Sequence, residues 1–134
     1  MKNLFALVML VFVSCSLAPE KKSPVIGVWK STPPEYHGWK GSTVKIWTAT
    51  YCTYVGEFRK DTVIYNVFGG GPYKLDGTHA EETISYNMDK NTIGKTFKMV
   101  YVVKGDTLFQ YYPADENWKY DTKTCNIDKY VRIE

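Results

Sequence analysis

Apolar and polar residues alternate along most of the chain after residue 25, which is the pattern of β-strands that bury one face. The clearest case is the segment 96–104, in which Phe97, Met99, Tyr101 and Val103 share one face. No segment shows a sustained helical period. Turn signals at short intervals separate eight predicted strands, at residues 25–30, 43–55, 62–68, 71–76, 78–86, 93–103, 107–112 and 127–133.

Two dipeptides, Asp-Gly at 76–77 and Gly-Asp at 105–106, are typical of tight hairpin turns. A two-residue loop at 105–106 pairs Val103 with Leu108, whereas a three-residue loop turns the opposite face of the next strand inward. We prefer the two-residue loop because it leaves a lysine and a threonine paired on the outside. The inner face of that strand then consists of Leu108, Gln110 and Tyr112.

Eight short antiparallel strands in one domain predict an all-β fold, an eight-stranded up-and-down barrel whose closure removes exposed sheet edges. A β-sandwich is the alternative. Three glycines at 69–71 are expected where the barrel turns a corner. A barrel of this size is either filled by side chains or holds one small ligand. The candidate ligand-binding wall consists of Trp47, Phe97, Met99, Tyr101, Leu108 and Tyr112.

The N-terminus has the features of an export signal. Lys2 precedes an unbroken apolar run at 4–13, which is too short to span a membrane. Cleavage at a small residue near 14–18 is one interpretation, and a bacterial lipobox that ends at a lipidated Cys15 is the other. We favour the second, which gives a signal peptide at 1–14, a tether at 15–24 and a barrel domain at 25–134. The expected location is the cell envelope, as an outer-membrane lipoprotein, with a periplasmic or secreted protein as the alternative.

The cysteine count adds a further expectation. The chain has three cysteines, and lipidation of Cys15, or its removal with the signal peptide, leaves Cys52 and Cys125. In an oxidising compartment these two residues can close a disulfide, with two free thiols as the alternative.

Two groups of residues resemble a family. The segment VIGVWK at 25–30 contains Gly27 and Trp29, and the spacing resembles the Gly-x-Trp signature of lipocalins. The segments FGGGPYKLDGTHAEETISY and IGKTFKMVYVVKGDTLFQYY resemble a bacterial lipocalin-like family of small exported proteins and lipoproteins. The chain departs from that family at Ala80, at Tyr130 and in the loop 113–126.

The resemblance implies a barrel, export and, by analogy, ligand binding. It also implies that Trp29 packs against a basic residue near the end of the last strand, which is Arg132 here. Stacking of a guanidinium on an indole contributes about 0.5–2 kcal/mol.

Charge and motifs exclude several functions. The net charge is +3, from 17 basic and 14 acidic residues, and no basic run suited to nucleic acid is present. No catalytic motif and no Cys/His spacing for a metal occurs, so we expect a protein that is not an enzyme and holds no cofactor or metal. Glu81 and Glu82 point to opposite faces of a strand, so at most one faces inward. Arg59 is a candidate partner for it.

The leading hypothesis is a lipid-anchored barrel that binds a small apolar or amphipathic molecule. The alternative is a filled barrel that docks a surface protein or glycan through its long loops at 31–42 and 113–126. These loops carry Tyr36, His37, Trp39 and Trp118, and aromatic residues in loops often form contacts. They can equally fold back over one end of the barrel as a lid.

Overall fold

The computed structural model describes residues 23–32 and 38–134. The described residues form nine strands and one 3-10 helix, η1 (Lys90–Thr92). The strands are β1 (Gly27–Ser31), β2 (Lys40–Trp47), β3 (Tyr51–Lys60), β4 (Val63–Asp76), β5 (His79–Thr83), β6 (Tyr86–Asn87), β7 (Thr96–Lys104), β8 (Thr107–Tyr112) and β9 (Asn126–Arg132).

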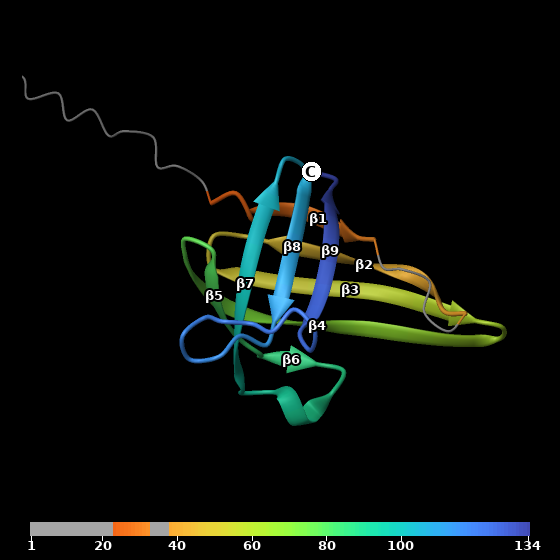
Figure 1. Ribbon diagram of the computed structural model, residues 1–134. Helices are drawn as coiled ribbons and strands as arrows, with labels where there is room; N and C mark the ends of the chain where they lie inside the picture. The colour runs from red at the N-terminus through yellow and green to blue at the C-terminus, as the bar shows by residue number, and fades with distance from the viewer. Residues whose placement is uncertain (1–22, 33–37) are drawn as a thin grey trace, which may run out of the picture.

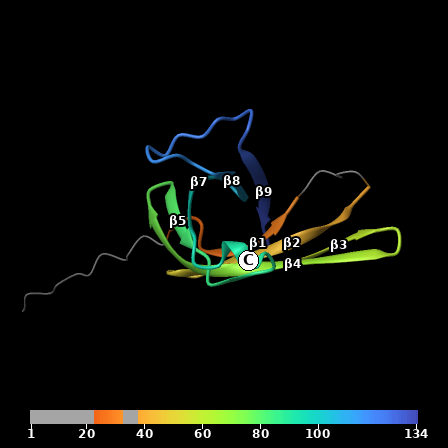
Figure 2. The ribbon, with the colours of Figure 1, turned by 90° about the horizontal axis from the view of Figure 1, so that it is seen from below.

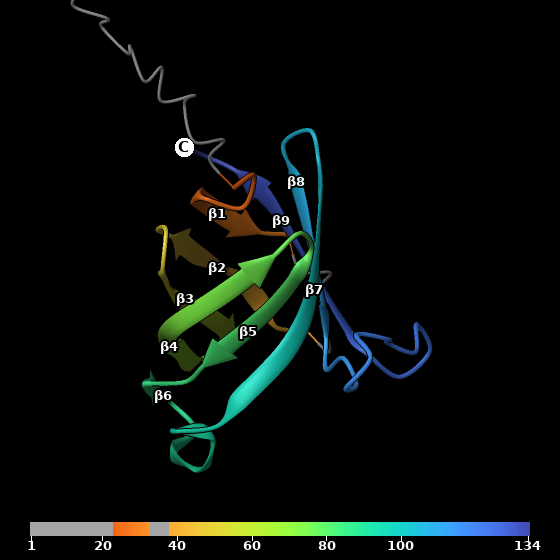
Figure 3. The same cartoon turned by 90° about the vertical axis from the view of Figure 1, so that its left-hand side faces the viewer.

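Eight of these strands form a closed antiparallel ring. The order is β3-β2-β1-β9-β8-β7-β5-β4, and pairing of β4 with β3 completes it. The strand β6 lies outside the ring, beside the glycines of β4. Figure 3 shows the strands arranged around a common centre. The fold is therefore an all-β, eight-stranded up-and-down barrel of the lipocalin-like kind, which confirms the predicted fold class.

The single strand predicted at 43–55 is wrong, because it contains a hairpin between β2 and β3. The Thr48 hydroxyl donates to the carbonyl oxygen of Tyr51 at 3.0 Å and accepts from the Tyr51 N–H at 3.1 Å. A threonine side chain thus organises this turn in place of the glycine or proline that a sequence search looks for. The strand β2 also begins inside the predicted loop at 31–42.

The two strands predicted at 62–68 and 71–76 are one continuous strand, β4. Its first ten residues pair with β3 and its last four pair with β5. A Cβ atom at Gly71 would overlap the carbonyl oxygen of Thr83, so only glycine permits this close approach. The three glycines pair with β3, and the change of partner from β3 to β5 follows directly after them, between Pro72 and Tyr73.

The predicted register of the last hairpin is confirmed. Val103 pairs with Leu108, and Lys104 pairs with Thr107. The strand β7 begins at Thr96, later than predicted, because η1 and a turn precede it.

One end of the barrel is closed by packed side chains. The Arg132 guanidinium lies 4.0 Å from the centroid of the Trp29 ring. The same guanidinium donates to the carbonyl oxygens of Ile26 at 2.9 Å and Pro24 at 2.6 Å. A Cβ atom at Gly27 would overlap that guanidinium. The Gly27, Trp29 and Arg132 arrangement expected from the resemblance is therefore present, and it joins β1 to β9.

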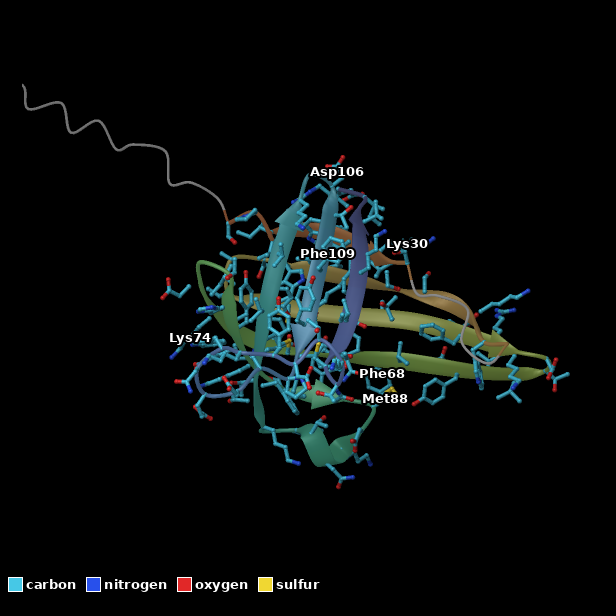
Figure 4. All side chains as sticks on the ribbon, in the orientation of Figure 1. Lys30, Phe68, Lys74, Met88, Asp106 and Phe109 are labelled. Atoms are coloured by element: carbon cyan, nitrogen blue, oxygen red, sulfur yellow. The ribbon has the colours of Figure 1, made fainter. Side chains whose placement is uncertain are left out.

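The hairpin of β3 and β4 extends well beyond the ring as an arm (Figures 1 and 2). Exposed apolar side chains on the arm include Val55, Val63, Ile64, Tyr65 and Phe68. Figure 4 shows Phe68 beside Met88, where the backbone N–H of Met88 donates to the Phe68 carbonyl oxygen. The arm leaves the barrel at the end opposite the packed one, and it continues the part of the wall formed by β3 and β4.

The loop between β8 and β9 packs on the outside of the barrel. The Trp118 ring stacks on His79 with centroids 4.7 Å apart, and the Lys98 ammonium lies 5.2 Å from the Trp118 ring. The side chains of His79 and Lys98 lie on the outer faces of β5 and β7, so Trp118 forms no lid over a barrel end. Trp39 lies edge-on to Tyr65 at 6.2 Å. Tyr36 and His37 lie outside the described residues.

Candidate ligand-binding cavity

The barrel contains a cavity of about 480 Å³ between its packed end and the base of the arm. Ligand pockets of proteins usually have volumes of about 300–1,000 Å³, so this one is large enough for a small molecule. The lining residues are Ser31, Thr43, Lys45, Tyr54, Phe58, Val67, Glu82, Ile84, Asn87, Thr92, Phe97, Met99, Gln110, Tyr112, Asp128 and Tyr130.

The structure divides the predicted ligand-binding wall into two groups. Phe97, Met99 and Tyr112 line the cavity, and Met99 is also part of the buried core. Trp47, Tyr101 and Leu108 belong instead to the packed core. Trp47 lies edge-on to Tyr101 with ring centroids 4.8 Å apart. The barrel is therefore solid at one end and hollow at the other, a combination of the two alternatives left open by the sequence.

A buried lysine stands at the boundary between the packed end and the cavity. The Lys45 ammonium donates to a carboxylate oxygen of Glu82 at 3.3 Å and to the amide oxygen of Gln110 at 3.0 Å. It also lies 4.6 Å from the centroid of the Trp47 ring. Lys45 is 2% exposed and Glu82 is 1% exposed. Such a pair costs desolvation energy that apolar residues would avoid, so its presence is weak evidence that it stabilises the fold.

The pattern of apolar and polar residues did not predict that Lys45 faces the interior. In the segment TVKIW, the apolar residues Val44 and Ile46 face outward, and Lys45 faces the interior with Trp47. This inverts the usual rule that apolar positions of a strand face the core. The available signal was the placement of Lys45 two residues before Trp47, because side chains two apart share a face.

The electrostatics keep Lys45 charged. Burial is the largest single effect and alone would lower its pKa, but Glu82, Tyr101 and Cys52 together more than compensate, and the pKa lies above its ordinary value. The partner suggested for an inward glutamate was wrong. Arg59 forms its ion pair with Glu57 on the exposed arm, far along β3 from Lys45.

The predicted disulfide is also wrong, since Cys52 and Cys125 are both free. Cys52 is buried in the barrel, and burial raises the pKa of its thiol to about 12. Cys125 lies in the loop near Tyr111, whose side chain is on the outer face of β8. The two thiols are thus on opposite sides of the barrel wall.

A second polar group lies on β9. The Asp128 carboxylate lines the cavity and accepts a hydrogen bond from the Tyr130 hydroxyl at 3.3 Å. Burial raises the pKa of Asp128, an effect that Lys45 opposes only partly. The pKa of Tyr112 is raised to about 12 by burial and by the Asp128 carboxylate. Among the described residues, Asp128 forms no ion pair.

The cavity is therefore amphipathic. Its apolar side chains come mainly from β3, β4, β7 and the segment after β5, namely Phe58, Val67, Ile84, Phe97 and Met99. The ring order places β8 and β9 across from β3 and β4, and these two strands supply Gln110, Tyr112, Asp128 and Tyr130. A molecule with one apolar side and one polar group would find a suitable surface on each wall.

No family model matches this chain, and the searches of curated proteins and of solved structures found no similar protein. The family resemblance therefore stays a prediction. In the described part of the chain, no helix is long and apolar enough to cross a membrane. The same residues hold no group of three His, Cys, Asp or Glu side chains placed to hold a metal ion.

Proposed function

We propose that this protein is a non-enzymatic, lipid-anchored barrel of the cell envelope that binds a small, partly apolar molecule in its cavity. The observation that carries the proposal is the cavity itself, a hollow of about 480 Å³ lined by apolar side chains and by a few buried polar ones. Binding sites for small molecules have this composition, in which apolar walls supply affinity and isolated polar groups supply orientation.

The contrast between the two ends of the barrel supports this proposal. At the closed end, Trp47, Tyr73 and Tyr101 pack edge to face and fill the interior. Directly beyond these rings, the buried ion pair of Lys45 and Glu82 adjoins the cavity. A barrel that needed only stability would fill that space with apolar side chains, because empty volume in a core is destabilising.

The test is binding of a neutral apolar fluorophore, N-phenyl-1-naphthylamine, to the exported protein and to a variant with a filled cavity. Met99→Trp places a larger side chain in the cavity. The matched control is Val102→Trp on the same strand, where the side chain faces outward between Tyr101 and Val103. We expect Met99→Trp to weaken binding about tenfold or more and the control to leave it unchanged. Equal binding by all three folded proteins would refute the proposal.

The anchor is tested separately. Cys15→Ser removes the lipid attachment that we propose, so the variant should leave the membrane fraction and appear in the soluble envelope fraction. Unchanged membrane partitioning of the variant would overturn this part of the proposal.

The alternative function, docking of a protein or glycan through the loops, gains no support from Trp118, because its ring already contacts His79 and Lys98.

A further inference from the structure

The ammonium and carboxylate groups that line the cavity do not balance in charge. They are one ammonium, on Lys45, and two carboxylates, on Glu82 and Asp128. Lys45 and Glu82 form an ion pair at 3.3 Å. The carboxylate of Asp128 is left without a cationic partner among the described residues. With all three groups ionised, the cavity carries one net negative charge.

The Lys45 ammonium is poorly placed to bind an anionic ligand. It donates to both Glu82 and Gln110. Its remaining side faces aromatic rings, with Trp47 at 4.6 Å and Tyr101 at 5.8 Å from the respective ring centroids. An anion that reached Lys45 would have to compete with the Glu82 carboxylate and would add a second negative charge to the cavity.

Asp128, in contrast, offers an acceptor for a cation. It projects from β9 into the cavity, and its partners among the described residues are the hydroxyls of Tyr112 and Tyr130, the latter at 3.3 Å. Burial of the Asp128 carboxylate raises its pKa, and Lys45 and the two tyrosine hydroxyls offset this effect only in part. A nearby cation would supply a charge-assisted hydrogen bond to this carboxylate.

The geometry points to an amphiphilic amine as the ligand: its ammonium group binds the Asp128 carboxylate, and its apolar body lies against Phe58, Val67 and Phe97. This inference rests on the proposed function, because it assigns a chemical class to the molecule in the same cavity. Binding of the amine would bring the cavity to electrical neutrality without disturbing the ion pair of Lys45 with Glu82.

The experiment compares three probes of one chain length, octylammonium, 1-octanol and octanoate, by displacement of N-phenyl-1-naphthylamine at neutral pH. In the wild-type protein, we expect octylammonium to bind about tenfold or more tightly than 1-octanol, and octanoate to bind most weakly. Asp128→Asn should abolish the preference for the amine and leave the affinity for the alcohol nearly unchanged. The control is Asp106→Asn, at the β7–β8 turn on the closed end of the barrel (Figure 4), and it should keep the wild-type order.

The outcomes separate this inference from the proposed function. If octanoate binds most tightly, or if the alcohol equals the amine, the inference is overturned while ligand binding in the cavity stands. If no probe displaces the fluorophore because neither fluorophore nor probe binds, the proposed function fails and the inference fails with it. If Asp128→Asn does not fold, the order of the three probes on the wild-type protein alone decides.

Discussion

Replacement of Lys45 by methionine tests whether the buried ion pair is a coupled unit. Met has a similar length but no charge, so Lys45→Met leaves the Glu82 carboxylate, 1% exposed, without its cation. Removal of one partner of a buried pair typically costs about 3–5 kcal/mol. Domains of ordinary stability unfold with about 5–15 kcal/mol, so the variant should lose a large part of its stability. For a chain of this size the melting temperature should fall by about 10–20 °C.

The double variant Lys45→Met/Glu82→Met separates charge from packing. It removes both charges, and apolar replacement of a whole buried pair is often neutral or stabilising, so its stability should return to within about 1 kcal/mol of wild type. The control is Arg59→Met, which breaks the exposed pair with Glu57 and should cost less than about 1 kcal/mol.

Urea unfolding followed by tryptophan fluorescence measures all of these variants. The reasoning is refuted if Lys45→Met is as stable as wild type, or if the double variant is less stable than the single one.

Three further predictions concern the closed end, the bend and the thiols. Gly71→Ala forces a Cβ atom into a backbone carbonyl oxygen of β5 and should cost about 3 kcal/mol or more in urea unfolding, and a smaller loss would mean that β4 can shift. Arg132→Ala removes the stacking on Trp29 and two hydrogen bonds to carbonyl oxygens, so it should cost about 2–4 kcal/mol in the same assay. Under native conditions an alkylating reagent should modify Cys125 but not Cys52, and mass spectrometry should show both as reduced thiols after unfolding, whereas a loss of two hydrogens would restore the disulfide.

The sequence predicted the class of the fold more reliably than the limits of its strands. Eight predicted strands match the eight strands of the ring only because two errors cancel. One predicted segment, 43–55, is the hairpin of β2 and β3, and two predicted segments, 62–68 and 71–76, are the single strand β4. Both errors arose at turns and bends, because a threonine formed a turn and three glycines did not interrupt a strand. Local residue preferences cannot show where a strand ends or which strands it pairs with, because both depend on how the whole barrel closes.

The site was less predictable than the fold, for a physical reason. Alternation along β7 correctly placed Phe97 and Met99 at the cavity, since side chains two apart share a face. The same rule does not tell how far along the barrel the core ends, so Trp47 was predicted as ligand wall and lies in the core. Lys45 and Asp128 were missed because a charged residue on a strand is normally exposed, and only the closed ring shows that these two face inward.

The sign of the pH dependence at Asp128 gives a test of the site that needs no ligand. In the folded protein, burial raises the pKa of Asp128 above its ordinary value of 3.8. At a pH between 3.8 and this raised pKa, the folded chain therefore holds more protons than the unfolded chain. Stability is therefore lost as pH rises through that interval, by about 1.4 kcal/mol for each unit of separation. Asn cannot ionise, so the stability of Asp128→Asn relative to wild type should increase as pH rises from acidic to neutral in urea unfolding.

The difference in stability between variant and wild type is the useful quantity, because Lys45, Tyr112 and Tyr130 also act on Asp128 and their own titration largely cancels in it. Asp106→Asn, an exposed control, should show no such trend. A difference that stays flat or declines would mean that the ionised carboxylate is well stabilised inside the barrel. The reason for proposing a cationic ligand there would then be gone, because a carboxylate already compensated by its surroundings gains little from an ammonium group.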